Sequence, residues 1–203
     1  MIFLLACSEY VVNQEVKRDP VQQPPITEED YEGQPPNWGA CAQGFSAVYF
    51  NHDANHIDFA IEEEEEPQED PAQLDWWDSA YRSFERYDAS LDFGEFWYPV
   101  NDGFQGDPNY FAVRWNAWLR VYDNNQTISF VLGSADDFWL HTPDEILFHR
   151  AGIHDYELEV IDVPIARGQY PITILYAHRS ENSGLSFRLV SDNAQLCFPD
   201  WDE

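Results

Sequence analysis

The stretch QTISFVLGSADDFWLHTPDEILFH, residues 126–149, alternates apolar and polar side chains in three short runs. These runs are rich in β-branched and aromatic residues, and turn-forming residues separate them, as is typical of antiparallel strands. The pattern predicts strands at Thr127–Leu132, Phe138–Leu140 and Glu145–His149. Asp136 and Asp137 stand where the middle strand begins. Neighbouring side chains of a regular strand point to opposite faces, so these carboxylates can share an ion only if the backbone between them is unusual.

Runs of the same kind occur on both sides of this stretch. They predict further strands at Gly44–Phe50, Ile57–Ile61, Phe93–Val100, Tyr110–Tyr122, Tyr156–Val163, Gln169–His178 and Leu185–Val190. Short strands with turn signals between them favour an all-β fold, an antiparallel two-sheet β-sandwich. One stretch differs: Leu74–Tyr87 carries apolar residues at helical spacing, which predicts a short helix.

Composition indicates one folded domain with a strongly acidic surface. The chain has 203 residues, of which 44% are hydrophobic and 16% aromatic, so it can bury a core. It carries 38 acidic and 10 basic residues, which gives a formal net charge of -28. A field of this sign repels nucleic acid and anionic lipid, so neither is an expected partner, whereas divalent cations are attracted. The alternative is that most of these charges only solvate the surface.

The N-terminal residues suggest a lipid anchor. Leu4-Leu5-Ala6-Cys7 is similar to the lipobox of bacterial lipoproteins, in which the cysteine is lipidated and the leader is removed. On this interpretation residues 1–7 are a leader remnant, residues 8–37 an extended Pro-, Gln- and Glu-rich tether, and residues 38–203 the sandwich domain. Only six residues precede Cys7 and none is basic, so the alternative is a chance match.

The other two cysteines are consistent with a location outside the cytosol. Cys41 and Cys197 bracket the folded region and are expected to form a disulfide, because disulfides persist in oxidising compartments. Closing so long a loop would stabilise the fold by ~5 kcal/mol in the chain-entropy model. We therefore expect an extracytoplasmic, membrane-anchored lipoprotein of the outer membrane or cell surface. The lipid would be its only membrane contact, since no stretch approaches the roughly 20 apolar residues of a membrane span.

Enzyme motifs are not evident. The sequence contains no GxSxG, no phosphate-binding loop, no dinucleotide fingerprint and no CxxC pair. His52 and His56 have the HxxxH spacing that binds zinc on a helix, but they stand in a predicted loop. We expect a binding or structural protein and not an enzyme.

Several segments together resemble one family. They are IDFAI (57–61), YFAVRWNAWL (110–119), TISFVLGSADDFWLH (127–141) and RGQYPITILYAHRSENSGLSFRL (167–189). They look like the lectin-like PA-fourteen domain, of the anthrax protective antigen type, which also occurs in flocculins, adhesins and fibro-slime proteins. The similarity extends over residues 43–192. It implies a β-sandwich and, for the sugar-binding members, a carbohydrate or cell-surface glycan as the partner.

The resemblance also implies a metal site. In sugar-binding members the paired aspartates are joined by a cis peptide and bind Ca²⁺, which places a calcium site at Asp136 and Asp137. A cis non-proline bond costs ~3–4 kcal/mol and persists only where something compensates, such as an ion bound by both carboxylates. The asparagine that supplies a third ligand in the adhesins is replaced by His178 here. Asn182, four residues on, is the expected substitute, since calcium prefers oxygen ligands.

The sugar itself is expected to contact Trp139, whose ring can cover a sugar face, and His178 and Ser180 in the following loop. The alternative for Trp139 is core filling, since strand aromatics are usually buried. The alternative for the aspartates is that they only begin a strand and accept hydrogen bonds from turn amides. The predicted function is a monomeric, carbohydrate-binding or adhesin-type module that uses Ca²⁺. A structural or protein-interaction module of the cell envelope that binds no sugar is the alternative.

Overall fold

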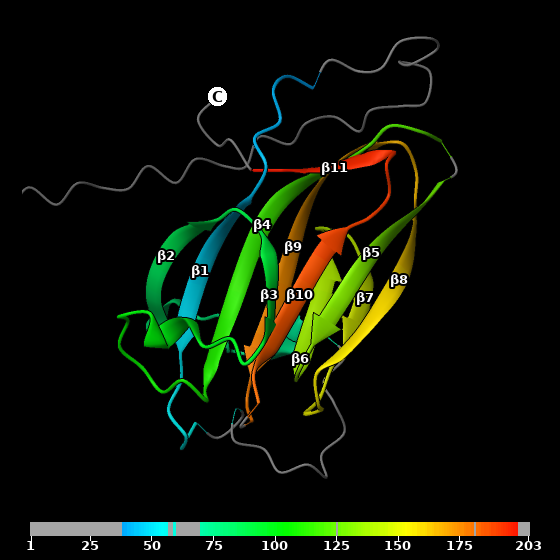
Figure 1. The fold of residues 1–203 in the computed structure, drawn as a ribbon. Helices are drawn as coiled ribbons and strands as arrows, with labels where there is room; N and C mark the ends of the chain where they lie inside the picture. Colours follow the sequence, from blue (N-terminus) through cyan, green and yellow to red (C-terminus); the bar gives the residue numbers. More distant parts are fainter. Residues whose placement is uncertain (1–37, 57–58, 60–69, 125, 181, 199–203) are drawn as a thin grey trace, which may run out of the picture. The chain divides into compact units, whose positions relative to one another are not determined.

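The computed structural model describes residues 38–56, 59, 70–124, 126–180 and 182–198. These residues form two packed antiparallel sheets, which confirms the predicted β-sandwich (Figure 1). The larger sheet has seven strands, in the order β2 (Arg82–Asp88), β1 (Phe45–Asn51), β4 (Phe111–Val121), β9 (Gly168–His178), β6 (Asp137–His141) and β7 (Ile146–Arg150), with β11 (Ala194–Cys197) beside β4. The smaller sheet has four strands, in the order β3 (Leu91–Glu95), β10 (Gly184–Leu189), β5 (Gln126–Ser134) and β8 (Glu157–Ile165).

Strand β4 is the centre of the larger sheet. It pairs with β9 along its whole length on one side, and with β1 and then β11 on the other. Its alternate residues point into the space between the sheets, where Phe111, Trp115 and Leu119 are fully buried. The smaller sheet adds Ile128, Phe130 and Leu132 of β5 to the same core. The period of two in the sequence therefore arises because one face of each strand meets the opposite sheet.

The predicted helix at Leu74–Tyr87 is wrong. The chain there forms the short 3-10 turns η2 (Pro71–Gln73) and η3 (Ser79–Tyr81) and then enters β2. Asp70 and Asp78 each accept a hydrogen bond from a backbone N–H of the turn that follows them. Each cap begins only a short 3-10 turn, and the chain enters the β2 strand directly after the second one, so no longer helix forms.

The helical spacing has a different cause, which is a second apolar layer on the outer face of the larger sheet. There Trp76 packs with apolar side chains of β1, β4, β6 and β9, among them Phe50, Ala112, Trp139 and Leu175. Leu74, Trp77 and Tyr81 are half-buried against this layer. Part of the larger sheet is thus buried on both faces, and the segment that covers its outer face supplies the regularly spaced aromatic residues.

Three other expectations have mixed outcomes. The strand expected at Phe93–Val100 ends at Glu95, and the 3-10 turn η4 (Pro99–Asn101) follows, because proline supplies no N–H for a strand ladder. Of the strand expected at Ile57–Ile61, Phe59 lies in a turn and is fully buried, and the other residues lie outside the described part. Cys7, the leader remnant and the tether at 8–37 also lie outside it.

The structure joins Cys41 to Cys197 by a disulfide. The bond links the segment that leads into β1 to the last residue of β11. Within the described residues, no helix has the length and apolar character needed to cross a membrane.

Candidate functional site

The aspartate pair lies where the turn after β5 enters β6, at the end of the sandwich opposite β11 (Figure 1). No cis peptide bond occurs in the described residues, so the bond between Asp136 and Asp137 is trans, and the cis bond implied by the family resemblance is absent. The unusual backbone takes another form: Asp136 has φ 63°, in the left-handed region. Aspartate is among the residues that tolerate this region best. A left-handed residue before β6 lets both carboxylates reach neighbouring loops.

Asp136 is fully buried and has four hydrogen-bonding neighbours. Its carboxylate accepts hydrogen bonds from the backbone N–H of Arg179 (2.7 Å), the Ser180 hydroxyl (3.1 Å) and the backbone N–H of His154 (3.4 Å). The ring Nδ1 of His178 lies 3.0 Å from Oδ2. Burial acts to raise the pKa of Asp136, but the hydrogen bonds from His178, Arg179 and Ser180 outweigh it and hold the pKa below its usual value.

Asp137 is 1% exposed and is held by an arginine. Its Oδ2 accepts a hydrogen bond from Arg179 Nε (2.7 Å), and its Oδ1 accepts one from the backbone N–H of Gly152 (2.6 Å). Burial raises the pKa of Asp137, and the charge of Asp136 adds to this effect, while the Arg179 guanidinium opposes it. The Arg179 side chain is only 7% exposed and stacks over the Trp76 ring at 4.9 Å. Arg179 therefore supplies the positive charge that this buried site needs.

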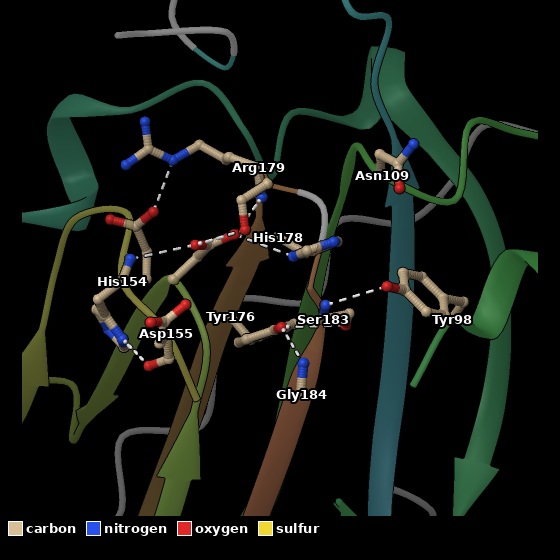
Figure 2. A network of polar contacts seen from close by, with 12 residues as sticks. Tyr98, Asn109, His154, Asp155, Tyr176, His178, Arg179, Ser183 and Gly184 are labelled. Atoms are coloured by element: carbon tan, nitrogen blue, oxygen red, sulfur yellow. Dashed lines mark hydrogen bonds and ion pairs between the residues drawn. The ribbon is translucent and has the colours of Figure 1, made fainter. Parts of the chain in front are cut away.

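Further polar contacts fix the loop between β9 and β10, as Figure 2 shows. The Tyr176 hydroxyl lies 3.3 Å from the Ser183 hydroxyl and accepts a hydrogen bond from the backbone N–H of Gly184 (3.3 Å). The Tyr98 hydroxyl accepts one from the backbone N–H of Ser183 (3.4 Å). Three loops, β5–β6, β7–β8 and β9–β10, are thus tied together at one end of the sandwich.

The structure changes the roles of several predicted residues. Trp139 is fully buried in the outer apolar layer, beside Trp76 and Trp77, so it cannot stack on a ligand, and that assignment is wrong. His178 is also fully buried and contacts Asp136, so it positions the aspartate and does not face a ligand. Its role as a ligand contact is wrong for the same reason: a bound sugar could not reach it.

The two remaining predicted residues lie in the loop that follows β9. Ser180 is half-buried, and its hydroxyl donates a hydrogen bond to the Asp136 carboxylate. Asn182 is exposed. The structure thus brings His178 and Ser180 together with the aspartates, while a metal-binding role for Asn182 stays a prediction.

The site as arranged does not fit calcium. Calcium takes 6–8 oxygen ligands, whereas the oxygens of both aspartates already accept hydrogen bonds from N–H and O–H donors. In the described part of the chain, no group of three or more His, Cys, Asp or Glu side chains is placed to hold a metal. The charge that an ion would supply comes from Arg179 instead. Calcium binding stays a prediction, and it requires Arg179 to leave Asp137.

Sequence reasoning missed Arg179, as well as the backbone donors at Gly152 and His154. A signal for Arg179 existed, because it is one of only 10 basic residues in a chain with 38 acidic ones, and it directly follows a long strand. The contact with Asp137 is 42 residues away in the sequence, so this signal marked Arg179 as unusual without naming its partner.

The comparisons with known proteins concern the fold. No family profile matches the sequence, and no curated protein matches it. Among solved structures, the PA14 domain of the MpAFP antifreeze protein superposes with a TM-score of 0.55 at 11% identity, over 80% of this chain and 94% of that one. The PA14 sugar-binding domain of an RTX adhesin gives a TM-score of 0.53 at 12% identity, over 76% of this chain and 98% of its own.

An epithelial adhesin domain has a similar fold. The A domain of epithelial adhesin 9 from Candida glabrata, solved with Galb1-3GlcNAc, gives a TM-score of 0.53 at 11% identity, over 84% of this chain and 95% of that one. An anti-sigma factor domain-containing protein is similar at 15% identity with a TM-score of 0.53, over 79% of this chain, which spans about half (50%) of that protein. At these identities the likeness concerns the fold, and it confirms the PA14-like sandwich that the sequence resemblance predicted.

Proposed function

We propose that this chain is a carbohydrate-binding, adhesin-type module that acts outside the cytosol. Two of the solved structures that share its fold are a sugar-binding domain of an RTX adhesin and an adhesin domain bound to Galb1-3GlcNAc. The observation that carries the proposal is the sandwich shared with these two domains, which the Cys41–Cys197 disulfide and the hydrogen bonds around Asp136 hold rigid. A rigid scaffold suits binding, because its binding residues are ordered in advance and this lowers the entropic cost of binding.

The disulfide supports the proposed location. Disulfides form and persist in oxidising compartments and are rare in the cytosol, and the structure joins Cys41 to Cys197. A net charge of -28 also disfavours adhesion through anionic lipid or nucleic acid. Lipidation of Cys7 is the finer part of the proposal, and mass spectrometry of the mature protein from membranes would detect the added acyl chains. An unmodified Cys7 would remove the anchor from the proposal.

A glycan array tests the binding function. The intact chain, labelled at an amine, is applied to neutral and acidic glycans once with excess Ca²⁺ and once with a chelator. Binding to a defined set of glycans is the expected result, and the difference between the two conditions measures the predicted calcium dependence. If the folded protein binds no glycan in either condition, the proposal is wrong.

One observation favours a second candidate, a structural or protein-interaction module of the cell envelope. The carboxylates of the aspartate pair already accept hydrogen bonds from Arg179, Gly152 and Ser180, as expected in a scaffold that needs no ion. This candidate predicts a folded protein with no glycan binding, so the same array separates the two.

A further inference from the structure

We propose that a groove on the outer face of the larger sheet is the saccharide-binding site of this chain, and that it takes a neutral saccharide. The inference rests on the proposed carbohydrate-binding function and gives that function a location. The groove has a volume of about 690 Å³ and lies between residues 71–78 and the outer faces of β4, β9 and β6. This volume lies within the range of ligand sites, about 300–1,000 Å³.

The floor of the groove is a row of polar side chains on three neighbouring strands. Asn116 of β4 stands opposite Thr173 of β9, and Thr173 stands opposite His141 of β6. Arg114 lies two residues before Asn116 on β4, so it faces the same side of the sheet, opposite Leu175 of β9. The sheet ladder fixes the spacing of these groups, which makes the floor more rigid than a loop surface.

The floor offers hydrogen-bond donors for which the described residues provide no acceptor. The Thr173 hydroxyl donates to Asn116 Oδ1 (3.1 Å), which turns the amide N–H groups of Asn116 away from that contact. The Arg114 guanidinium lies over the Phe50 ring at 5.6 Å, and within the described residues it makes no hydrogen bond or ion pair. Burial lowers the pKa of Arg114, which reflects the loss of water around its charge. A half-buried arginine of this kind leaves several N–H donors for a ligand.

The wall of the groove adds an apolar surface and acceptors. Trp77 is held in place, because its Nε1–H donates to the backbone carbonyl of Val113 (3.2 Å) and its ring meets Trp139 edge-on at 5.7 Å. The exposed carboxylates of Asp75 and Asp78 stand on the same wall. The groove therefore combines donors on the floor with acceptors and an indole on the wall.

This combination fits a sugar better than the other common ligands. Sugar hydroxyls both donate and accept hydrogen bonds, and the C–H face of a pyranose packs on aromatic rings. An acidic ligand would meet two rim carboxylates and a chain of net charge -28, so a neutral saccharide is the favoured class. The aspartate pair cannot take this role in the arrangement seen, because both of its carboxylates are buried.

The experiment compares glycan binding by the intact chain and matched variants on an array of neutral and acidic glycans, followed by titration calorimetry with the strongest binder. Arg114→Ala and Asn116→Ala remove two floor donors. Arg188→Ala is the matched control, because it deletes the same charge at an exposed site on the smaller sheet. Melting temperatures show that each variant is folded. We expect at least a tenfold loss of affinity for each floor variant, equivalent to about 1.4 kcal/mol, and an unchanged affinity for the control.

The outcomes separate this inference from the proposed function. If the wild type binds neutral glycans and both floor variants bind as well as the control, the groove is not the site, while the carbohydrate-binding function stands. Ser180→Ala, which removes a hydrogen bond to Asp136, is measured beside these variants; a loss seen only there would place the sugar at the aspartate end and also overturn the inference. Binding confined to acidic glycans would contradict the neutral class. A wild type that binds no glycan would refute the proposed function itself.

Discussion

Replacing Arg179 by alanine tests whether this side chain stands in for a cation. In the wild type the Arg179 side chain is 7% exposed and pairs with Asp137, whose side chain is 1% exposed. The substitution leaves a buried carboxylate with only the Gly152 N–H as a described donor. Breaking a buried ion pair from one side costs about 3–5 kcal/mol, because the remaining charge is uncompensated. For a chain of this size, that corresponds to a melting temperature lower by roughly 6–20 °C, at about 2–4 °C for each kcal/mol.

The assay is urea unfolding followed by tryptophan fluorescence, with the disulfide intact. Arg188→Ala serves as the control, since its pair with Asp92 is half-exposed and is expected to contribute less than about 1 kcal/mol. Arg179→Ala also removes the stack on Trp76, so Arg179→Met, which keeps apolar volume there, separates lost packing from lost charge. A loss below about 1 kcal/mol for Arg179→Ala would refute the reasoning, because the pair would then behave as a surface one.

The pH dependence of the same variant gives an independent check. Burial already raises the pKa of Asp137, and deleting the guanidinium raises it further. When the pKa of a carboxyl is higher in the folded protein than its unfolded value of about 4, raising the pH above about 4 lowers the stability, because the unfolded protein releases the proton more easily. The deficit of Arg179→Ala relative to the wild type should therefore shrink as the pH falls from 7 toward about 4. A deficit that is constant over this interval would show that the charge of Asp137 is not the cause.

Three further results are expected. Excess Ca²⁺ should raise the melting temperature of Arg179→Ala more than that of the wild type, because only the variant lacks a cation at the two carboxylates; a larger shift in the wild type would show that calcium displaces Arg179. Replacing Cys41 and Cys197 together by serine should lower the free energy of unfolding by about 5 kcal/mol, since the bond closes a loop with a sequence separation of 156, and unfolding in denaturant measures the change. The pKa of Asp136 is lowered in the folded protein, so the Asp136 carboxylate contributes stability above the unfolded pKa of about 4, and this contribution is lost in more acidic solution. Asp136→Asn should therefore lower the free energy of unfolding less at pH 3 than at pH 6. An equal loss at both pH values would contradict the hydrogen-bond account.

The sequence predicted the two-sheet architecture, although it did not predict β2 or β11. Alternating runs such as 111–121 and 168–178 have one face in the core, and this local periodicity survives in any arrangement of the strands. The aspartate pair at the start of β6 also stood out, because two adjacent carboxylates can act together only if the backbone between them is unusual. The structure meets this condition with a left-handed Asp136 and not with the cis bond that the resemblance implied.

Only the tertiary structure decided what the aspartates and aromatics do. Arg179 and His154 are 42 and 18 residues away from their aspartate partners, so nothing local in the sequence marks the contacts. Trp139 could face either a ligand or a core, and the segment that covers the outer face of the sheet made it core. That segment also forms one wall of the groove over Arg114 and Asn116. The sequence thus determined most of the strands, because periodicity is a local property, but not β2 or β11. Charge pairing and pocket walls depend on long-range packing, which a single sequence does not display.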